Sequence, residues 1–574
     1  MLKLKQHLVL LLLFMVSIAF AQKREQDTLI TDVINVVKPY TPTISDAFKV
    51  KQIPALNTKQ ITQKQPVDYK IFSFPVASTF TPAKGAAAIL DKAIKESFYS
   101  NYAHLGLGSN LSLLADLYVN YKLDRDQNIG IHLSHLSSQN GVSDVLTDTN
   151  YSNSKIDVNY ANSGKDLSYN LNGGFQYGTN NWYGLQPQLF TQNIANALDV
   201  SQSYSNAYIS GDLNFRESIL KSTSILFRRF ADSYGSGENR FKANAVADID
   251  VLEHSITANV FVDYLGGTFN QDFYTNSAID YGNTQFGIAP SYVFSQDNLV
   301  VNIGFKTVVA NNKELGKTKF YIYPNVTASY RLVDKVVSAF AGLQGNLDQN
   351  SYFGFSEVNP FVSPDLFIVP TDRQFKAFGG FRGQLSSTIS YEVSGSYTAA
   401  KAQALFVNNS ITAVTNPYIF GNSFSVVYDN MTTVALNGQL QVDVNQEFSL
   451  GVKGTYYGYN TKTEAEAWNL PDMEAALFLN YKFTDKISAG ASLFYVGQRK
   501  DRFQQENVSP LIPEQTYNLS AYLDANVRFN YKINDRFSAY LKVQNLTAQQ
   551  YEKWQNTPVQ GIEVLGGATY KFDF

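Results

Sequence analysis

Histidine is the side chain that most often acts in acid–base and metal chemistry, and this chain contains five. His132 and His135 are three residues apart, and on a β-strand an odd spacing places two side chains on opposite faces. They therefore cannot bind one metal ion together. His104 and His254 stand alone, and we interpret them as residues of turns or membrane interfaces. His7 lies in the N-terminal apolar segment described below, so the histidines predict no metal site.

Motifs for phosphate or nucleophilic chemistry are incomplete or absent. Gly316-Lys317-Thr318 matches the end of a phosphate-binding loop, but Asn311 stands where that motif needs its first glycine, and we expect no helix to follow. The Gly-x-Ser-x-Gly pattern of a nucleophile elbow does not occur. Without cysteine the chain has no disulfide and no thiolate metal site. We therefore predict no enzyme activity, no catalytic residue and no cofactor.

Aromatic side chains in expected loops are the remaining candidates for ligand contact. They occur at Asn181-Trp182-Tyr183, Tyr352-Phe353-Gly354-Phe355, Asn416-Pro417-Tyr418-Ile419-Phe420 and Trp468. Such rings can stack on sugars or pack against a partner protein. Alternatively they pack within their own loops or form an interfacial girdle, which is the interpretation we favour. Charged candidates for the lumen are Lys306, Arg331, Arg528, Lys542 and Asp524, and because they mix both signs we expect them to compensate one another.

Composition narrows the class of protein. The formal net charge of −3 provides no basic surface for nucleic acid. Aromatic residues make up 14% of the chain, with 37 Tyr and 40 Phe, while charged residues make up only 17%. Outer-membrane barrels use aromatic residues as girdles at both membrane interfaces. Beyond the N-terminal segment, no apolar run is long enough for a transmembrane helix.

A two-residue period recurs from residue 98 to the C-terminus. One example has Ala115, Leu117, Val119, Tyr121 and Leu123 alternating with Asp116, Tyr118, Asn120, Lys122 and Asp124. Successive side chains of a strand point to opposite faces, so such a strand presents one face to lipid and one to a wet lumen. The run Phe227-Arg228-Arg229-Phe230 does not fit, because its arginines occupy both parities. One of them would face lipid unless it lies near a membrane interface, where its long side chain can reach polar surroundings. We interpret the segment as a local misreading of the alternation.

The strand at the C-terminus shows the same alternation over Gly561–Phe574 and ends on an aromatic residue. Its apolar parity includes Tyr570, Phe572 and Phe574. Bacterial outer-membrane barrels carry a terminal aromatic residue on their last strand, where the assembly machinery recognises it. We therefore interpret these three aromatic residues as a C-terminal assembly signal.

Breaks between the alternating segments are of two classes, short and long, and a short break is usually followed by a long one along the chain. Tight polar breaks include 124–128, 163–166, 445–447 and 534–536, and longer ones include 139–151, 178–201, 348–372, 400–430 and 501–516. Outer-membrane barrels have short periplasmic turns and long external loops. Counting the hairpins gives about 22 strands. The sequence therefore predicts an all-β fold, a transmembrane antiparallel β-barrel over residues 98–574.

Two further segments precede the barrel. Residues 1–21 have a basic start, an apolar run and the small-x-small pattern Ala19-Phe20-Ala21, as in a secretory signal peptide. No cysteine follows for lipid attachment. Residues 22–97 contain regularly spaced prolines and no sustained period, so we expect an extended segment in the periplasm or the barrel lumen, with a short helix within 85–97.

The C-terminal region resembles that of a TonB-dependent receptor. The run Phe537–Thr547, which ends Asn545-Leu546-Thr547, is followed by Tyr551 and then by the final strand. The expected strand number matches the 22-stranded transporters of the outer membrane. Asp27, Thr28, Leu29, Ile30, Thr31, Asp32 and Val33 are similar to the family's energy-coupling box. A second interpretation of this segment is an extended apolar stretch that pairs with the edge of a partner's strand.

The resemblance implies solute transport across the bacterial outer membrane, energised by a TonB-type coupler. That family has a folded plug domain before the barrel, whereas residues 22–97 are fewer and lack its Gly-rich and Arg-rich motifs. The alternative is a non-conducting structural or accessory barrel subunit of a multi-protein outer-membrane complex. Expected partners are outer-membrane lipid, the barrel assembly machinery and either the coupler or partner proteins of the periplasm and outer membrane.

Overall fold

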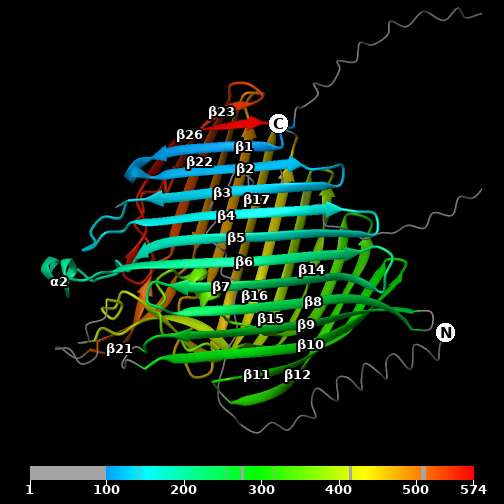
Figure 1. The fold of residues 1–574 in the computed structure, drawn as a ribbon, viewed down its shortest axis with the longest axis horizontal. Coiled ribbons are helices and arrows are strands. Elements are labelled where there is room, and N and C mark those ends of the chain that lie inside the picture. The colour runs from blue at the N-terminus through cyan, green and yellow to red at the C-terminus, as the bar shows by residue number, and fades with distance from the viewer. Residues whose placement is uncertain are drawn as a thin grey trace, which may run out of the picture. The chain divides into compact units, whose positions relative to one another are not determined.

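The computed structural model describes residues 98–574 except for 140, 252–253, 273–276, 315, 413–416, 446 and 506–511. One closed antiparallel sheet of 22 strands dominates this part of the chain (Figure 1). The fold class and strand number predicted from the sequence are confirmed. No helix in the described part of the chain is both long and apolar enough to span a lipid bilayer.

The strands of the barrel follow one another in chain order, with three short helices and two small hairpins in the connections. The barrel strands are β1 (Asn101–Gly108), β2 (Leu113–Lys122), β3 (Gln127–Ser138), β4 (Tyr151–Ser163), β5 (Leu167–Asn181), β6 (Ser201–Phe215), β7 (Leu220–Asp232), β8 (Gly237–Val251), β9 (His254–Phe269), β10 (Ile279–Gln296), β11 (Leu299–Asn312), β12 (Lys317–Val333), β13 (Val337–Asp348), β14 (Thr371–Ser386), β15 (Ile389–Asn408), β16 (Phe424–Asp443), β17 (Phe448–Thr461), β18 (Met473–Lys482), β19 (Ile487–Val496), β22 (Tyr522–Lys532), β23 (Phe537–Gln544) and β26 (Glu563–Phe572). The connections contain η2 (Ser109–Leu111), α2 (Gln192–Asn196), α3 (Tyr352–Val358), the hairpin β20 (Arg499–Gln505) with β21 (Ile512–Leu519), and the hairpin β24 (Glu552–Trp554) with β25 (Thr557–Pro558).

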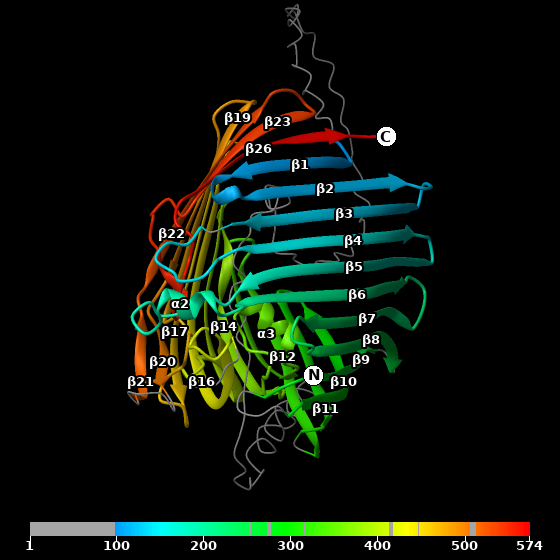
Figure 2. The ribbon, with the colours of Figure 1, turned by 60° about the vertical axis from the view of Figure 1, so that its left-hand side comes forward.

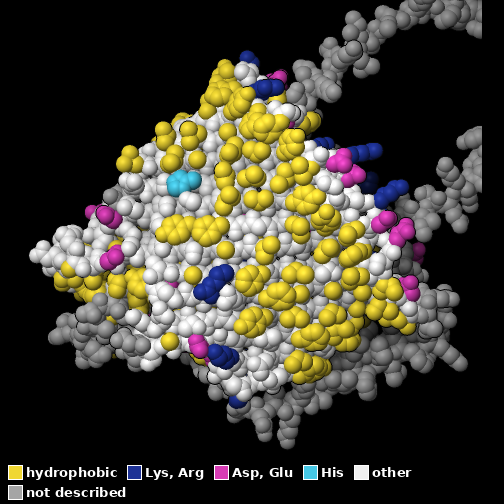
Figure 3. All heavy atoms as spheres, in the orientation of Figure 1, with side chains coloured by type: hydrophobic (Ala, Val, Ile, Leu, Met, Phe, Trp, Pro, Cys, Tyr) yellow, Lys and Arg dark blue, Asp and Glu magenta, His cyan; other side chains and the backbone are white. Residues whose placement is uncertain are grey.

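Alternation along each strand separates an apolar outer wall from a polar lumen. On β12, Phe320 and Ile322 are 62% and 61% exposed, whereas the intervening parity includes Tyr323 at 2%. Hydrophobic side chains are spread over much of the wall visible in Figure 3, and most of its charged side chains lie toward the edges, with Lys or Arg over β7 as an exception. Lipid can solvate the apolar face and water the lumenal face, which is why neither needs a covering layer.

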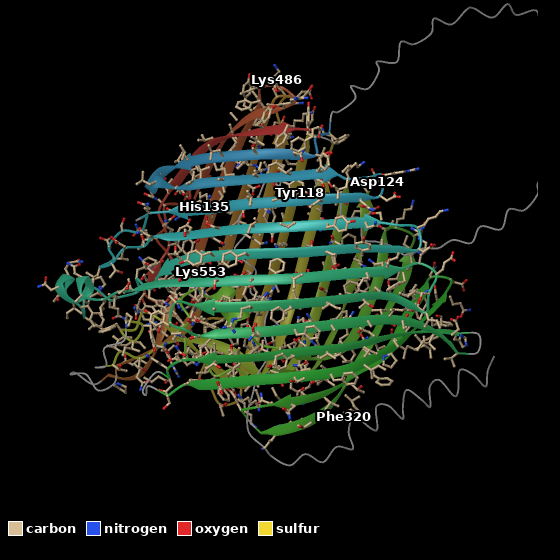
Figure 4. All side chains as sticks on the ribbon, in the orientation of Figure 1. Tyr118, Asp124, His135, Phe320, Lys486 and Lys553 are labelled. Atoms are coloured by element: carbon tan, nitrogen blue, oxygen red, sulfur yellow. The ribbon has the colours of Figure 1, made fainter. Side chains whose placement is uncertain are left out.

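Short turns lie at one end of the barrel and long connections at the other (Figure 4 labels Asp124 and Lys486 in short turns and Lys553 in a long connection). Several turns begin with a side-chain oxygen that accepts backbone N–H groups. Asn534 Oδ1 accepts from Arg536 and Phe537 at 2.9 and 2.8 Å. Such bonds satisfy turn amides that the sheet leaves unpaired.

The long connections contain more regular structure than the sequence predicts. β15 and β16 extend into the expected loop 400–430 and pair as far as Asn408↔Phe424. The expected loop 501–516 belongs largely to the β20–β21 hairpin. Pairing between segments outside the barrel wall satisfies their backbone groups without a lipid-facing stripe, so the barrel pattern does not reveal it.

The barrel closes where β1 pairs with β26, with Gly106 opposite Gly567. The Tyr540 ring on β23 lies over these two glycines, and a Cβ atom at either position would overlap the Tyr540 hydroxyl. The His104 ring stacks on Tyr540 with 4.3 Å between centroids, and His104 Nδ1 bonds with Thr569 Oγ1 at 2.8 Å. His104 is therefore a structural residue that covers the seam from the lumenal side.

The two adjacent arginines follow the alternation, so the segment is not the misreading that we favoured from the sequence. β7 continues through Phe227-Arg228-Arg229-Phe230 and pairs with both neighbours. Arg229 shares the outer face with the exposed Phe227, while Arg228 faces inward. Arg229 lies near the external end of β7, and a Cβ atom on Gly237 would overlap its guanidinium. Its long side chain thus reaches toward the polar membrane interface.

Candidate functional site beneath the external loops

The external loops pack together into a cluster of buried residues that we call the loop core. Its members are Trp182, Val200, Phe230, Leu265, Phe269, Tyr281, Tyr352, Phe355, Phe361, Val362, Leu366, Ile368, Val369, Ala404, Phe406, Tyr418, Ile419, Phe424, Val426, Tyr428 and Trp554. Trp182 and Tyr352 are fully buried and Tyr418 is 1% exposed. Trp468 is also buried, in a separate cluster with Leu405 and Val407. These rings are therefore packing residues, not open stacking surfaces.

A buried carboxylate on the barrel wall holds the loop between β13 and β14. Glu238 accepts hydrogen bonds from the backbone N–H of Tyr352 at 2.7 Å and of Phe353 at 3.3 Å, and from the Tyr281 hydroxyl at 2.9 Å. The Tyr352 hydroxyl donates to Asp232 at 2.8 Å. A buried carboxylate needs such donors to offset its lost hydration. These bonds place α3 against the inner faces of β7–β10 (Figure 2).

Hydrogen bonds also join loops that are far apart in the sequence. Asn422 Nδ2 donates to the carbonyl oxygens of Trp182 at 3.0 Å and Pro417 at 2.8 Å. The Tyr183 hydroxyl donates to the Pro558 carbonyl oxygen at 2.9 Å. The loops after β5, β15 and β23 are thereby fixed to one another, which makes them a joint cover over the external end of the lumen.

The β20–β21 hairpin is tied to the same cover through two charged side chains. Arg499 donates to the carbonyl oxygens of Glu552 and Lys553. Asp501 is fully buried and accepts the Asn408 N–H at 3.0 Å. Burial raises the pKa of the Asp501 carboxyl to about 6. Neither anchor was predicted, since each depends on contacts between distant loops.

The inner wall beneath the cover carries a network of titratable side chains across β2–β6. His132 Nε2 lies 3.2 Å from both carboxylate oxygens of Asp116 and its Nδ1 lies 3.7 Å from Asp157 Oδ2. Lys155 Nζ lies 2.8 Å from the same Asp157 oxygen, and the Tyr208 hydroxyl donates to Asp157. The charges of this network are largely compensated within it.

His135 lies on the outer face of β3 (Figure 4), where its two ring nitrogens bond with Ser154 and Ser137 at 2.8 and 3.1 Å. The opposite orientation of His132 and His135 predicted from their spacing is confirmed. Among the described residues, no group of three or more His, Cys, Asp or Glu side chains is placed to hold a metal ion. Lys317 begins β12, so no helix follows the Gly316-Lys317-Thr318 motif.

A second group of charges lies on β7–β9, close to α3. Arg228 is directly opposite Arg240 in the β7–β8 pair. Arg240 makes a two-pronged contact with Asp263, with Nε and Nη2 at 2.9 and 2.7 Å from its oxygens. Lys242 Nζ lies 3.8 Å from the same carboxylate. The Arg228 guanidinium lies over the Phe353 ring of α3, 4.0 Å from its centroid.

Three of the five lumenal residues named from the sequence have local partners. Lys306 Nζ donates to Asn346 at 2.5 Å, Arg331 lies 3.6 Å from Asp334, and Asp524 accepts the Tyr551 hydroxyl at 3.0 Å. These partners are on neighbouring strands or in nearby turns and loops. Glu238 was not predicted, because its role depends on a loop more than a hundred residues away in the sequence.

The other predicted site residues divide into two groups. Asp27–Val33 lie outside the described residues. On β26, Tyr570 lies on the outer face, and its ring stacks on Phe572 with 5.8 Å between centroids. Phe574 is 79% exposed and its ring contacts Tyr121 across the seam. An exposed aromatic end of the last strand is accessible to other proteins, and its role as an assembly signal stays a prediction.

Comparisons with known proteins identify the fold. No family model and no curated protein sequence matches the chain. Among solved structures, the pyoverdine outer membrane receptor FpvA from Pseudomonas aeruginosa PAO1 matches with a TM-score of 0.60 at 14% identity, covering 84% of this chain and 79% of that one. The FrpB iron transporter from Neisseria meningitidis matches with a TM-score of 0.63 at 10% identity, covering 83% and 82%.

The siderophore receptor PirA from Acinetobacter baumannii matches similarly, with a TM-score of 0.60, 12% identity and coverage of 84% and 81%. At these identities the likeness shows the fold. The chain therefore has the fold of the 22-stranded β-barrels of outer-membrane receptors and transporters. The resemblance found in its C-terminal residues is confirmed at the level of the fold, and the solved structures that share the fold are receptors and transporters.

Proposed function

We propose that this protein carries a solute across the outer membrane and is energised by a TonB-type coupler. The observation that carries the proposal is the cover of interlocked loops above a wall of charged side chains. Such a cover separates the lumen from the exterior, so passage of a solute requires the loops to part. The solved structures with the same fold bear names of receptors and of an iron transporter, which agrees with this role.

The coupler contact is assigned to Asp27–Val33. A photo-reactive amino acid at Ile30 should cross-link to the periplasmic domain of the coupler in living cells. Deletion of residues 27–33 should abolish accumulation of the transported solute, whereas deletion of residues 58–64, of equal length in the same segment, should not. Cross-linking to an outer-membrane barrel or lipoprotein in place of the coupler would contradict the assignment.

A second candidate function is an accessory subunit of an outer-membrane complex. It is favoured by residues 22–97, which are too few and too rich in proline to match the plug of the related transporters. In that case the segment tethers periplasmic partners, and the barrel does not need to conduct. Purification in mild detergent distinguishes the two, because a subunit co-purifies with partners in fixed ratio and a transporter is recovered alone.

We also propose that residues 1–21 are removed as a signal peptide and that the barrel assembly machinery recognises Tyr570, Phe572 and Phe574. Replacing Phe574 with Ala should lower the amount of protein in the outer membrane and increase its degradation in the periplasm. Replacing Phe483, which is exposed in a short turn, should not. Equal amounts of the Phe574 variant and the native protein in the outer membrane would exclude this role.

A further inference from the structure

Three cations lie side by side on the inner faces of β7 and β8. Arg228 and Arg240 are cross-strand partners, and Lys242 is two residues from Arg240 on the same face. Like charges that face each other across a strand pair repel. We call these three residues the cation cluster. The repulsion among these three positive charges must be offset by negative charges nearby.

The structure supplies only part of this compensation. Asp263 binds Arg240 through both of its oxygens and also lies within 3.8 Å of Lys242. One carboxylate therefore serves two of the three cations. Arg228 has no carboxylate oxygen within 4.0 Å among the described residues, and its buried Nε has no hydrogen-bond partner there.

The carboxylates near Arg228 act on it only through space. Glu238 and Glu357 offset part of its charge, but neither forms an ion pair with it, and Glu238 accepts its three hydrogen bonds from Tyr352, Phe353 and Tyr281. On the other side, Tyr208 is the cross-strand partner of Arg228, and its hydroxyl donates to Asp157, whose charge is shared by Lys155. Among the described residues, the Arg228 guanidinium thus faces the lumen beside α3 without an ion pair.

We propose that the cation cluster recognises the anionic group of the transported solute. The guanidinium of Arg228 presents several N–H donors in a planar arrangement that matches carboxylate and phosphate oxygens. Lys242 is nearly half exposed and supplies a second positive charge. The solute class is therefore a small molecule bearing a carboxylate or phosphate. This inference rests on the proposed transport function.

The position of the cluster couples recognition to the cover. The Phe353 ring of α3 occupies one face of the Arg228 guanidinium, and Glu238 accepts hydrogen bonds from the backbone N–H groups of Phe353 and of Tyr352 before it. An anion that binds the edge of the guanidinium leaves this ring contact in place. Bound solute is therefore held directly beneath the loop that must move for it to enter.

The adjacent arginines provide a matched pair of variants for a binding test. Arg228→Gln removes the lumenal charge, whereas Arg229→Gln removes the same side chain from the outer wall. The purified full chain in neutral detergent is titrated with glucose 6-phosphate, gluconate and glucose at low ionic strength. We expect binding of one or both anions but not of glucose. Arg228→Gln should weaken binding about tenfold or more, and Arg229→Gln should leave it unchanged.

Loss of the barrel fold is excluded by requiring that both variants keep the native heat-dependent shift on electrophoresis. Equal binding of the anions by both variants and the native protein would overturn the proposal, as would equal affinity for glucose and the anions. The proposal would also be overturned if Arg228→Gln changed the hydrogen exchange of α3 but left anion binding unchanged. Because this assay measures binding without transport, deletion of residues 27–33 tests the proposed function separately. If the protein lacking residues 27–33 shows normal uptake and still binds anions, the proposed coupler contact is refuted. The assignment of the cation cluster as an anion site would then still stand.

Discussion

At the scale of single residues, burial decides what each charged group does. Glu238 and Arg228 lie within the same small region of the inner wall, yet their surroundings differ. Glu238 is 1% exposed and accepts three hydrogen bonds, so it acts as a structural anchor. Arg228 has a ring on one face and no paired carboxylate, so it keeps capacity for a ligand. The same distinction separates the structural His104 from the lumenal His132.

Removing the anchor tests its structural role. Glu238→Ala leaves two backbone amides and one hydroxyl without their acceptor, which we expect to destabilise the position of α3 by about 2–3 kcal/mol. Hydrogen exchange of residues 352–358 should quicken accordingly. Glu357→Ala serves as the control, because this side chain is exposed on α3 and forms no hydrogen bond or ion pair with the described residues of the wall. Unchanged exchange in the Glu238 variant would show that packing alone holds α3.

At the scale of elements, the loop cover and the barrel seam depend on different forces. The loop between β13 and β14 carries Asp365, whose carboxyl has its pKa raised to about 7 by burial and by the nearby Asp272. In an open, solvated loop the same group titrates near 3.8. The closed loop therefore keeps a proton that the open loop has already lost. Its stability is greatest at low pH and decreases as pH rises from about 4 to about 7.

Acidification should accordingly close the cover more tightly. We expect hydrogen exchange in residues 349–370, corrected for intrinsic rates, to show stronger protection at pH 5.5 than at pH 8. Asp365→Asn should flatten this dependence, because the amide carries no charge at either pH. A pH dependence that is the same in both proteins would assign the effect to other carboxyls, such as Glu314, whose pKa is also raised to about 7 by burial.

The seam between β1 and β26 depends on the Tyr540 ring. Replacing this ring with Ala uncovers Gly106 and Gly567, and we expect a loss of about 3 kcal/mol, as for other large-to-small substitutions of a buried aromatic side chain. The temperature at which the barrel unfolds on electrophoresis should fall. Tyr540→Phe should behave like the native protein, because the buried Tyr540 hydroxyl has no hydrogen-bond partner in the described part of the chain. If Tyr540→Ala unfolds at the native temperature, the ring does not stabilise the seam.

At the scale of the whole molecule, the barrel is a fixed wall and the loop core is its movable closure. The chain contains no cysteine, so a single Ser210→Cys substitution on the lumenal face of β6 gives one labelling site. A bulky maleimide added from outside should label this site slowly. Trp182→Ala removes a fully buried member of the loop core and should increase the rate several-fold, because cavity formation costs about 3–5 kcal/mol.

Trp468→Ala is the control for that measurement, since this tryptophan is equally buried but belongs to a different cluster. Its labelling rate should stay close to that of the protein with an intact loop core. Equal acceleration by both substitutions would mean that any loosening of the external loops opens the lumen. Rapid labelling of the Ser210→Cys protein with unsubstituted loops would mean that the cover does not exclude solutes at all.

The sequence by itself determined the barrel, because the signals for a barrel strand are local. Alternation in β2 and β12 identifies the lipid face within a few residues, and short turns such as the one at Asn534 carry their own hydrogen-bond acceptors. Local alternation also placed His132 and His135 on opposite faces. At Phe227-Arg228-Arg229-Phe230 the alternation alone could not decide between a misread segment and an arginine near the membrane interface, because the height of Arg229 in the wall could not be known from the sequence.

Only the tertiary structure decided how the external loops are arranged. The Tyr183 hydroxyl meets Pro558 across 375 residues, and Asn422 meets Trp182 across 240. No local pattern encodes such contacts, since they arise when the closed sheet brings distant loops to one end. The loop core, the Glu238 anchor and the surroundings of Arg228 follow from that closure, whereas the barrel wall follows from the alternation of neighbouring residues.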